Sequence, residues 1–491
     1  MRPLPLATLL SLALLAGSTA CSTATTPSLF NTSATNPTSD LTVAAPDPNQ
    51  AQIALASDTR DPNAPWIGAA PANDALMTGA QDTFVAVWVD VPQTIAEKQA
   101  PAAVSIVIDT SGSMAEGNRI KHARDAAIKL VNNLRDGDMV SLHTFSDDVR
   151  ERTSLTKLDA MSRQRIASII TELSAAGGTN LFEGVRQAGL AAMSSPGTHA
   201  VRRVVLLSDG NATVGTTSTE MIANLGEKAA DRGVQITSIG VGLQYNENAL
   251  NQLAVRSSGR LFHVTESSSL NEVVESELAL LKSTRASGAR VAIVPAPGVE
   301  LVSVEGARFV RGEHGALEVP LGSMFAGQHR EWIVRTRVNA PAEGSHALAS
   351  VRLSFADPSD GNVPRIQETI ARFEVTRDAA VFAAKKNLKA QGVMTMLAFS
   401  ESTKAAAMDF ERDDFAAADK RLAQAEEGLR MMAAQSTNEG ERKRFEQSVK
   451  KVQSARGSGA AAAAAPAPAK AAAKRKSSLE TNDAAMDLNG F

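Results

Sequence analysis

Cysteine is almost absent from this 491-residue sequence, in which Cys21 is the only example. A single cysteine excludes an intramolecular disulfide framework, a zinc ribbon and a cysteine-held iron–sulfur cluster. Neither sign of charge dominates, since 50 Lys and Arg residues stand against 53 Asp and Glu residues. The sequence therefore lacks the basic excess of a nucleic-acid-binding protein, and nucleic acid is not an expected partner.

Long apolar runs are also missing, and the most prominent one, Leu4 to Ala16, is too short for a membrane-spanning helix. It follows Arg2 and precedes small residues, which is the layout of a secretory signal peptide, predicted over residues 1–20. Cleavage after Ala20 would leave either a soluble exported protein or a bacterial lipoprotein acylated on Cys21. The segment resembles a lipobox, although Ser18 stands where that motif usually has Leu. The position of the only cysteine favours the lipoprotein.

Residues 21–72 are rich in Ser, Thr, Pro, Asn and Ala, a composition that predicts a disordered tether after the lipidated cysteine. Several acyl chains would anchor such a protein firmly to a membrane. The expected location is therefore the cell envelope of a bacterium, as an outer-membrane or surface lipoprotein.

The central part of the chain, residues 100–285, alternates apolar strands with amphipathic helices. This alternation predicts an α/β fold with a doubly wound, mostly parallel sheet. Short alternating strands over residues 286–377 predict an antiparallel β-sandwich. A strand at 84–91, within the segment 73–99, is expected to pair with this sandwich, so that the α/β domain is inserted in it.

Residues 378–456 return to helical spacing, with an apolar stripe that includes Phe415, Leu422 and Leu429. The stripe predicts a helical hairpin packed on the sandwich, and a partner-binding helix pair is the alternative. Residues 457–491 are rich in Ala, Pro and Lys, and are predicted to be a disordered tail.

Five oxygen-bearing side chains stand at predicted strand ends or at turns that enter helices. They are Asp109, Ser111, Ser113, Thr179 and Asp209. Asp109 and Asp209 each end a strand, and ligands of open α/β sheets bind beyond such strand ends. Two carboxylates and three hydroxyls suit Mg²⁺, with Mn²⁺ or Ca²⁺ as alternatives. The competing interpretation is that these residues merely cap helices.

The pattern D-x-S-x-S, then Thr, then Asp resembles the metal-ion-dependent adhesion site of von Willebrand factor type A domains. The resemblance covers about residues 100–285 and includes all five positions named above. It implies that the Ser and Thr side chains contact the metal, that the carboxylates act through water, and that an acidic residue of a protein ligand completes the shell. The flanking regions resemble exported bacterial proteins labelled "calcium-activated chloride channel-like".

Signatures of the common enzyme classes are missing from the sequence. It contains no H-E-x-x-H, no G-x-S-x-G and no Walker A motif. His143 and His263 fall in predicted strands, where structural roles are more common than catalytic ones. We therefore expect a non-enzymatic protein of the cell envelope that binds a partner protein through its metal site. The alternative is an envelope scaffold that acts through its helical region while the metal site is structural.

Overall fold

The computed structural model describes residues 66–94, 100–209, 212–241, 245–264, 270–340, 342–436, 439–488 and 490. The chain divides into two units, 1–46 and 47–491, and the described residues all belong to the second. The predicted signal peptide, Cys21 and residues 21–65 of the predicted tether lie outside them. In the described part, no helix combines the length and the apolar character that a bilayer crossing requires.

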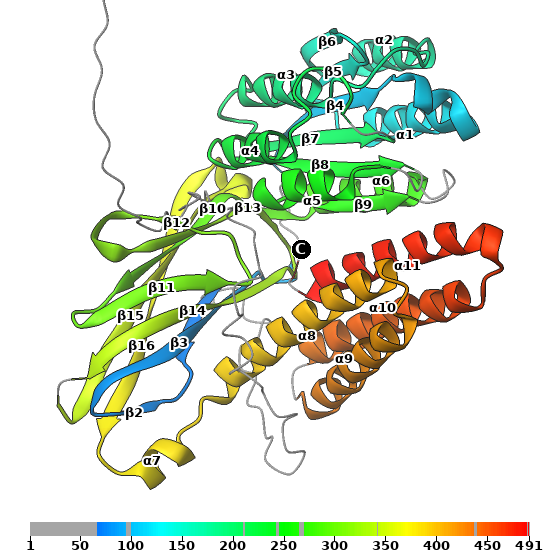
Figure 1. Cartoon of the computed structure of the whole chain (residues 1–491). Coiled ribbons are helices and arrows are strands. Elements are labelled where there is room, and N and C mark those ends of the chain that lie inside the picture. Colours follow the sequence, from blue (N-terminus) through cyan, green and yellow to red (C-terminus); the bar gives the residue numbers. More distant parts are fainter. Residues whose placement is uncertain are drawn as a thin grey trace, which may run out of the picture. The chain divides into compact units, whose positions relative to one another are not determined.

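A six-stranded sheet forms the centre of the α/β domain (Figure 1). Its order is β6-β5-β4-β7-β8-β9, and all neighbours are parallel except the β5–β6 pair. The strands are β4 (Ala102–Asp109), β5 (Met139–Phe145), β6 (Val149–Lys157), β7 (Val201–Ser208), β8 (Val234–Val241) and β9 (Leu261–Val264). β4 is a near-continuous apolar run, and β7 and β8 are almost completely buried, because helices cover both faces of the sheet.

The helices fall into two groups, one on each face of this sheet (Figure 1). Ile106 of β4 packs in one apolar cluster with α1, α2 and α6, whereas its neighbour Val107 packs in another with α3, α4 and α5. The helices are α1 (Arg119–Asn133), α2 (Ala160–Thr171), α3 (Leu181–Met193), α4 (Thr219–Ala230), α5 (Glu247–Arg256) and α6 (Leu270–Lys282). The short helix η2 (Gly112–Asn118) precedes α1. The predicted doubly wound fold is confirmed.

Two further sheets share one apolar core around Val85, Trp332 and Val351. One has the order β1-β3-β14-β11 and the other β12-β13-β10-β15-β16-β2, and only β16 and β2 pair in parallel. Their strands are β1 (Ile67–Pro71), β2 (Ala75–Met77), β3 (Gly79–Asp90), β10 (Thr284–Pro295), β11 (Val299–Glu305), β12 (Val310–Arg311), β13 (Leu317–Phe325), β14 (His329–Ala340), β15 (Gly344–Asp357) and β16 (Val363–Thr376). The α/β domain is inserted between β3 and β10. Because β1 begins at Ile67, the last residues assigned to the tether belong to this sandwich.

The described residues of the C-terminal region form five helices, so this region is larger than the predicted hairpin. They are α7 (Ala379–Ala384), α8 (Leu388–Glu411), α9 (Phe415–Gln435), α10 (Glu439–Ala464) and α11 (Ala467–Leu488). The four longest lie side by side and share a core that includes Phe410, Leu429 and Phe445 (Figure 1).

The prediction of a disordered tail is wrong for the described residues, because α10 continues through the alanine run and α11 follows it. Alanine has the highest intrinsic helix propensity, and proline is tolerated in the first turn of a helix, where Pro468 stands. Leu488 of α11 then packs in the bundle core, and Ser400 Oγ of α8 donates a 2.9 Å hydrogen bond to the Ala485 carbonyl. Tertiary packing thus fixes a segment whose composition alone indicates disorder.

Candidate metal centre

Asp109 is the last residue of β4, and its carboxylate is completely buried. The Ser111 backbone N–H donates to Oδ1 at 2.8 Å, and the Ser208 hydroxyl donates to Oδ2 at 2.6 Å. Burial raises the pKa of Asp109 to about 6, against the lowering effect of these hydrogen bonds, and the nearby Asp209 carboxylate adds to the rise. A cation beside Asp109 would favour its charged form.

Asp209 follows β7, which is the parallel neighbour of β4. The carboxyl ends of the two strands therefore meet, and side chains from both form one chain of hydrogen bonds. The Ser111 and Ser113 hydroxyls lie 3.1 Å apart, and Ser113 Oγ donates to Asp209 Oδ1 at 2.9 Å. The structure thus brings together four of the five predicted ligands, namely Asp109, Ser111, Ser113 and Asp209.

Thr179 reaches the same edge on the loop between α2 and α3. The Gly112 N–H donates to the Gly177 carbonyl at 2.9 Å, which fastens this loop to the turn after β4. The Thr179 backbone N–H donates to Thr213 Oγ1 at 2.9 Å, and its carbonyl accepts from the Thr213 N–H at 3.0 Å. Gly177 has a φ of +85°, a left-handed conformation that glycine adopts without strain. Thr179 itself is only 4% exposed.

Two residues at this site have roles that the sequence analysis missed. The Ser208 hydroxyl donates a hydrogen bond to Oδ2 of Asp109. The only sequence signal for this role is the position of Ser208 directly before Asp209. Arg119, at the start of α1, donates from Nη1 to Asp209 Oδ2 at 2.6 Å and to the Ser113 carbonyl at 3.3 Å. Asp209 therefore has a hydroxyl on one oxygen and a guanidinium on the other.

The donor set fits a small, hard divalent cation. In the described part of the chain, no three His, Cys, Asp or Glu side chains gather as a ligand group, so a site rich in carboxylates or imidazoles is not found there. The edge of the β4–β7 pair instead combines two buried carboxylates with serine hydroxyls. Oxygen ligands of this kind suit Mg²⁺, which keeps several of its waters when protein ligands are few.

Comparison with known proteins identifies the α/β domain. Residues 104–276 match the family model described as the von Willebrand factor type A domain, and the chain therefore contains such a domain. An uncharacterized protein of Synechocystis is 24% identical over 283 residues, which cover 56% of this chain and 66% of that protein. Human inter-alpha-trypsin inhibitor heavy chain H4 is 30% identical over 174 residues, covering 34% of this chain and 19% of the human one.

Among solved structures, a von Willebrand factor type A protein from Catenulispora acidiphila superposes with a TM-score of 0.63. The superposition covers 80% of this chain and 90% of the other at 18% identity, so it shows a shared fold beyond the inserted domain. By contrast, this chain spans two thirds or less of the curated relatives' own lengths. Domains of this family typically mediate protein–protein interactions, commonly bind divalent metal ions and are generally not enzymes.

Proposed function

We propose that this protein binds a partner protein through a divalent metal ion, Mg²⁺ above all, held at the edge of its type A domain. The observation that carries the proposal is the hydrogen-bonded network that joins Asp109, Ser111, Ser113 and Asp209 across the ends of β4 and β7. Helix capping does not account for it, since neither Ser111 nor Ser113 caps η2 through its side chain. The pairing of hydroxyls with buried carboxylates is what an oxygen-ligated cation needs.

In the proposed complex, the hydroxyls of Ser111, Ser113 and Thr179 hold the metal, while Asp109 and Asp209 orient its waters. The metal would supply an open coordination position for an acidic side chain of the partner. Ser208 keeps the Asp109 carboxylate fixed through a 2.6 Å hydrogen bond, which is the role of an outer-shell residue. Both carboxylates are buried, so solvent competes little with the metal for them.

The decisive experiment is to immobilise the chain without residues 1–21 and to expose it to solubilised envelope and secreted proteins of the source cell, with Mg²⁺ or with EDTA. The matched control is Asp109→Asn, which keeps the shape of the side chain but removes its charge. Calorimetric titration with Mn²⁺ establishes metal binding independently. A partner retained only with Mg²⁺, and only by the unmutated protein, would support the proposal.

A scaffold that acts through the C-terminal helices is the alternative. The observation in its favour is the size of this region, in which α8 to α11 form a bundle of four long helices. Retention of the same partners in Mg²⁺, in EDTA and by Asp109→Asn would favour the scaffold and leave the metal site a structural role.

We further propose that the protein is exported and anchored by acylation of Cys21. The support is the sequence alone: an apolar run after Arg2 and a single cysteine behind small residues. Mass spectrometry of the mature N-terminal peptide tests this proposal. An acylated peptide that begins at Cys21 is expected, and an unmodified peptide would instead indicate a soluble exported protein.

A further inference from the structure

The guanidinium of Arg119 occupies a position beside the proposed metal ligands. Nη1 contacts the buried carboxylate of Asp209 at 2.6 Å and the Ser113 carbonyl at 3.3 Å. The Asp209 side chain is 0% exposed and that of Arg119 is 22% exposed, so this ion pair is shielded from water on the carboxylate side. Asp209 already has its counter-ion before any metal arrives.

The backbone before Arg119 directs the side chain toward the site. Gly117 and Asn118 both adopt left-handed conformations, with φ of 57° and 60°. Consecutive left-handed residues reverse the chain, and only glycine and asparagine or aspartate adopt this conformation readily. The Arg119 backbone N–H then bonds to the Met114 and Glu116 carbonyls, which returns α1 to the turn that carries Ser113.

An alternative partner for the same guanidinium lies at the surface. Nη1 is 3.8 Å from Glu116 Oε2, and the Glu116 side chain is 76% exposed. If Arg119 moves away from Asp209, it can therefore still pair with the Glu116 carboxylate. A divalent cation next to Asp209 would repel the guanidinium strongly, because both would lie within a few ångströms in a poorly solvated region.

We propose that Arg119 is a built-in competitor of the metal: it neutralises Asp209 in the metal-free protein and is displaced when the divalent cation binds. This inference rests on the proposed metal site, and it adds that Arg119 regulates the affinity of that site for metal. It follows that the metal-free domain stays stable, since Asp209 is never buried without a counter-ion. It also follows that the site binds metal less tightly than the same ligands would without Arg119, because binding must first displace the guanidinium. The opposite possibility is that Arg119 only orients Asp209 for the metal, as outer-shell residues do.

The test measures the affinity of the whole chain for Mn²⁺ and Mg²⁺ by calorimetry, together with the melting temperature in EDTA. Arg119→Gln is expected to bind metal more tightly, on the order of tenfold, because the metal no longer has to break a charged hydrogen bond. The same variant should melt at a lower temperature in EDTA and regain stability with Mg²⁺. Lys121→Gln is the matched control, since it removes one positive charge from the exposed side of α1.

The outcomes separate the two proposals. Weaker or unchanged metal binding by Arg119→Gln would overturn the competition, while metal binding by the unmutated protein would leave the site itself intact. Binding of no metal by either protein would instead overturn the proposed function. If Arg119→Gln does not fold in EDTA, Arg119→Lys replaces it; it keeps the charge but lacks the planar fork, and intermediate affinity is expected.

Discussion

Thr179 is the residue on which the metal site can be tested with least damage to the fold. Its backbone is held by Thr213 and its side chain is nearly buried, whereas among the described residues no carboxylate or helix cap depends on its hydroxyl. Thr179→Ala should lower the affinity for Mg²⁺ by about tenfold, the effect of losing one bond to a charged group. Calorimetric titration measures it. Thr179→Ser, which keeps the hydroxyl, should bind nearly as well, and equal affinities for the Ala and Ser variants would contradict ligation by Thr179.

Gly177 tests whether the loop that carries Thr179 must be held rigidly. A Cβ there would lie 2.3 Å from Asp147 Oδ2, and φ is +85°. Gly177→Ala should therefore cost about 1–2 kcal/mol of stability and weaken metal binding. Gly189→Ala is the control, because a Cβ in that helix meets nothing within 4 Å and should stabilise α3 slightly. Thermal unfolding of the two variants should change in opposite directions.

The five candidate site residues are recognisable in the sequence because each stands at a strand end or on a turn before a helix. Asp109 and Asp209 approach each other because β4 and β7 are neighbours, which the alternation of strands and helices indicates. Arg119 and Ser208 could not be assigned in this way. Their roles depend on which atoms the folded backbone brings within hydrogen-bonding distance, and neither belongs to a spaced motif.

At the scale of elements, burial decides which strands and helices can be predicted from the sequence. The central strands β4, β7 and β8 are almost completely buried and each contains several apolar residues, so they are readily predicted. The edge strand β6 is harder to recognise in the sequence, because most of its side chains are exposed or half-buried and no apolar run marks it. For α11 the composition predicts disorder, but the segment forms a helix because it packs on α8 and α10.

The packing of α11 can be tested with one substitution at two positions of the helix. Ala485 is completely buried and Ala471 is exposed. Ala485→Asp should destabilise the protein by at least about 2 kcal/mol, because it places an unpaired charge in the bundle. Ala471→Asp should change stability by less than about 1 kcal/mol. Chemical unfolding of both variants measures the difference, and two equally stable variants would mean that the tail does not pack.

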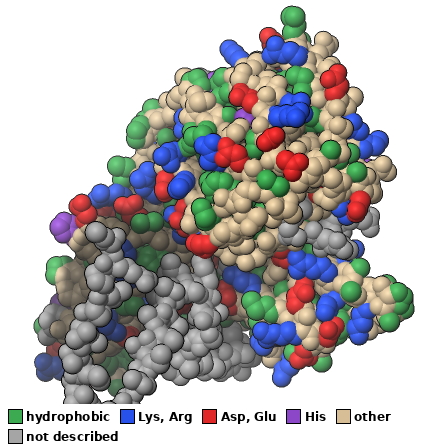
Figure 2. Space-filling model, turned by 45° about the horizontal axis from the view of Figure 1, so that its top comes forward, with side chains coloured by type: hydrophobic (Ala, Val, Ile, Leu, Met, Phe, Trp, Pro, Cys, Tyr) green, Lys and Arg blue, Asp and Glu red, His purple; other side chains and the backbone are tan. Residues whose placement is uncertain are grey.

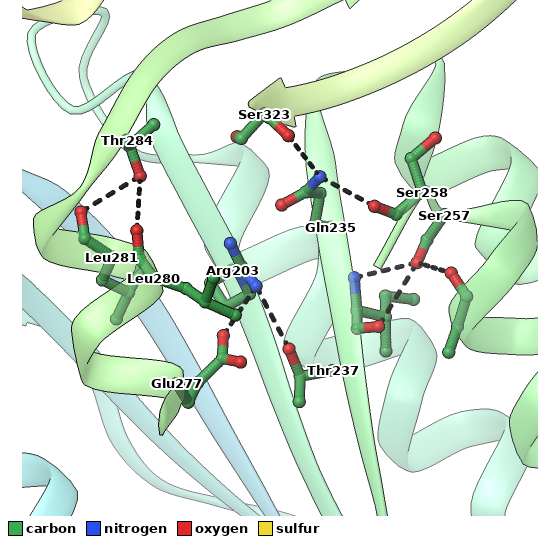
Figure 3. Close-up of polar contacts among 12 residues, drawn as sticks. Arg203, Gln235, Thr237, Ser257, Ser258, Glu277, Leu280, Leu281, Thr284 and Ser323 are labelled. Carbon is green, nitrogen blue, oxygen red and sulfur yellow. Dashed lines mark hydrogen bonds and ion pairs between the residues drawn. The ribbon is translucent and has the colours of Figure 1, made fainter. Parts of the chain in front are cut away.

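On the scale of the whole molecule, the inserted domain is tied to the sandwich by polar contacts at the end of its sheet away from the metal site. Gln235 Nε2 of β8 donates to the Ser258 carbonyl at 2.8 Å and to the Ser323 carbonyl of β13 at 3.0 Å (Figure 3). Beside it, Arg203 and Glu277 form an ion pair of 2.6 Å in which both side chains are 1% exposed (Figure 3). The Gln235–Ser323 bond joins the domain to the sandwich, and the Arg203–Glu277 pair lies within the domain beside it, whereas the edge that carries Asp109 and Asp209 is at the opposite strand ends.

The face of the molecule drawn in Figure 2 carries little information about the partner. Basic and acidic side chains intermingle over the face in Figure 2, which shows no broad area of one sign. This agrees with the balanced composition of the chain. With no broad charged area on this face to attract a partner from a distance, binding through the proposed metal site should depend more on chelator than on salt.

A buried charged cluster lies where the sandwich faces the helical bundle. His329 of β14 contacts Asp90 of β3 through Nδ1 and Glu331 through Nε2, the latter at 2.6 Å. Burial and the charge of Arg444 on α10 lower the pKa of His329, but the two carboxylates outweigh them and hold it above its ordinary value. The pKa values of Asp90 and Glu331 lie below their usual range, since attraction to His329 overcomes burial.

The stability of the protein should consequently depend on pH in a defined way. A raised histidine pKa contributes stability that is complete below about pH 6.5, the value in the unfolded chain, and is lost as pH rises through the folded value. The lowered carboxylate pKa values contribute above about pH 4 and fail in acid. The melting temperature should therefore fall as the pH rises above about 6.5 and through the raised pKa of His329. His329→Gln should be less stable at pH 6.5 but should lose less on going to pH 9, because it has no imidazolium to deprotonate. Arg444→Gln, which removes a repelling charge, should move the fall to higher pH. Parallel melting curves for His329→Gln and the unmutated protein over this range would show that the cluster does not set the pH response.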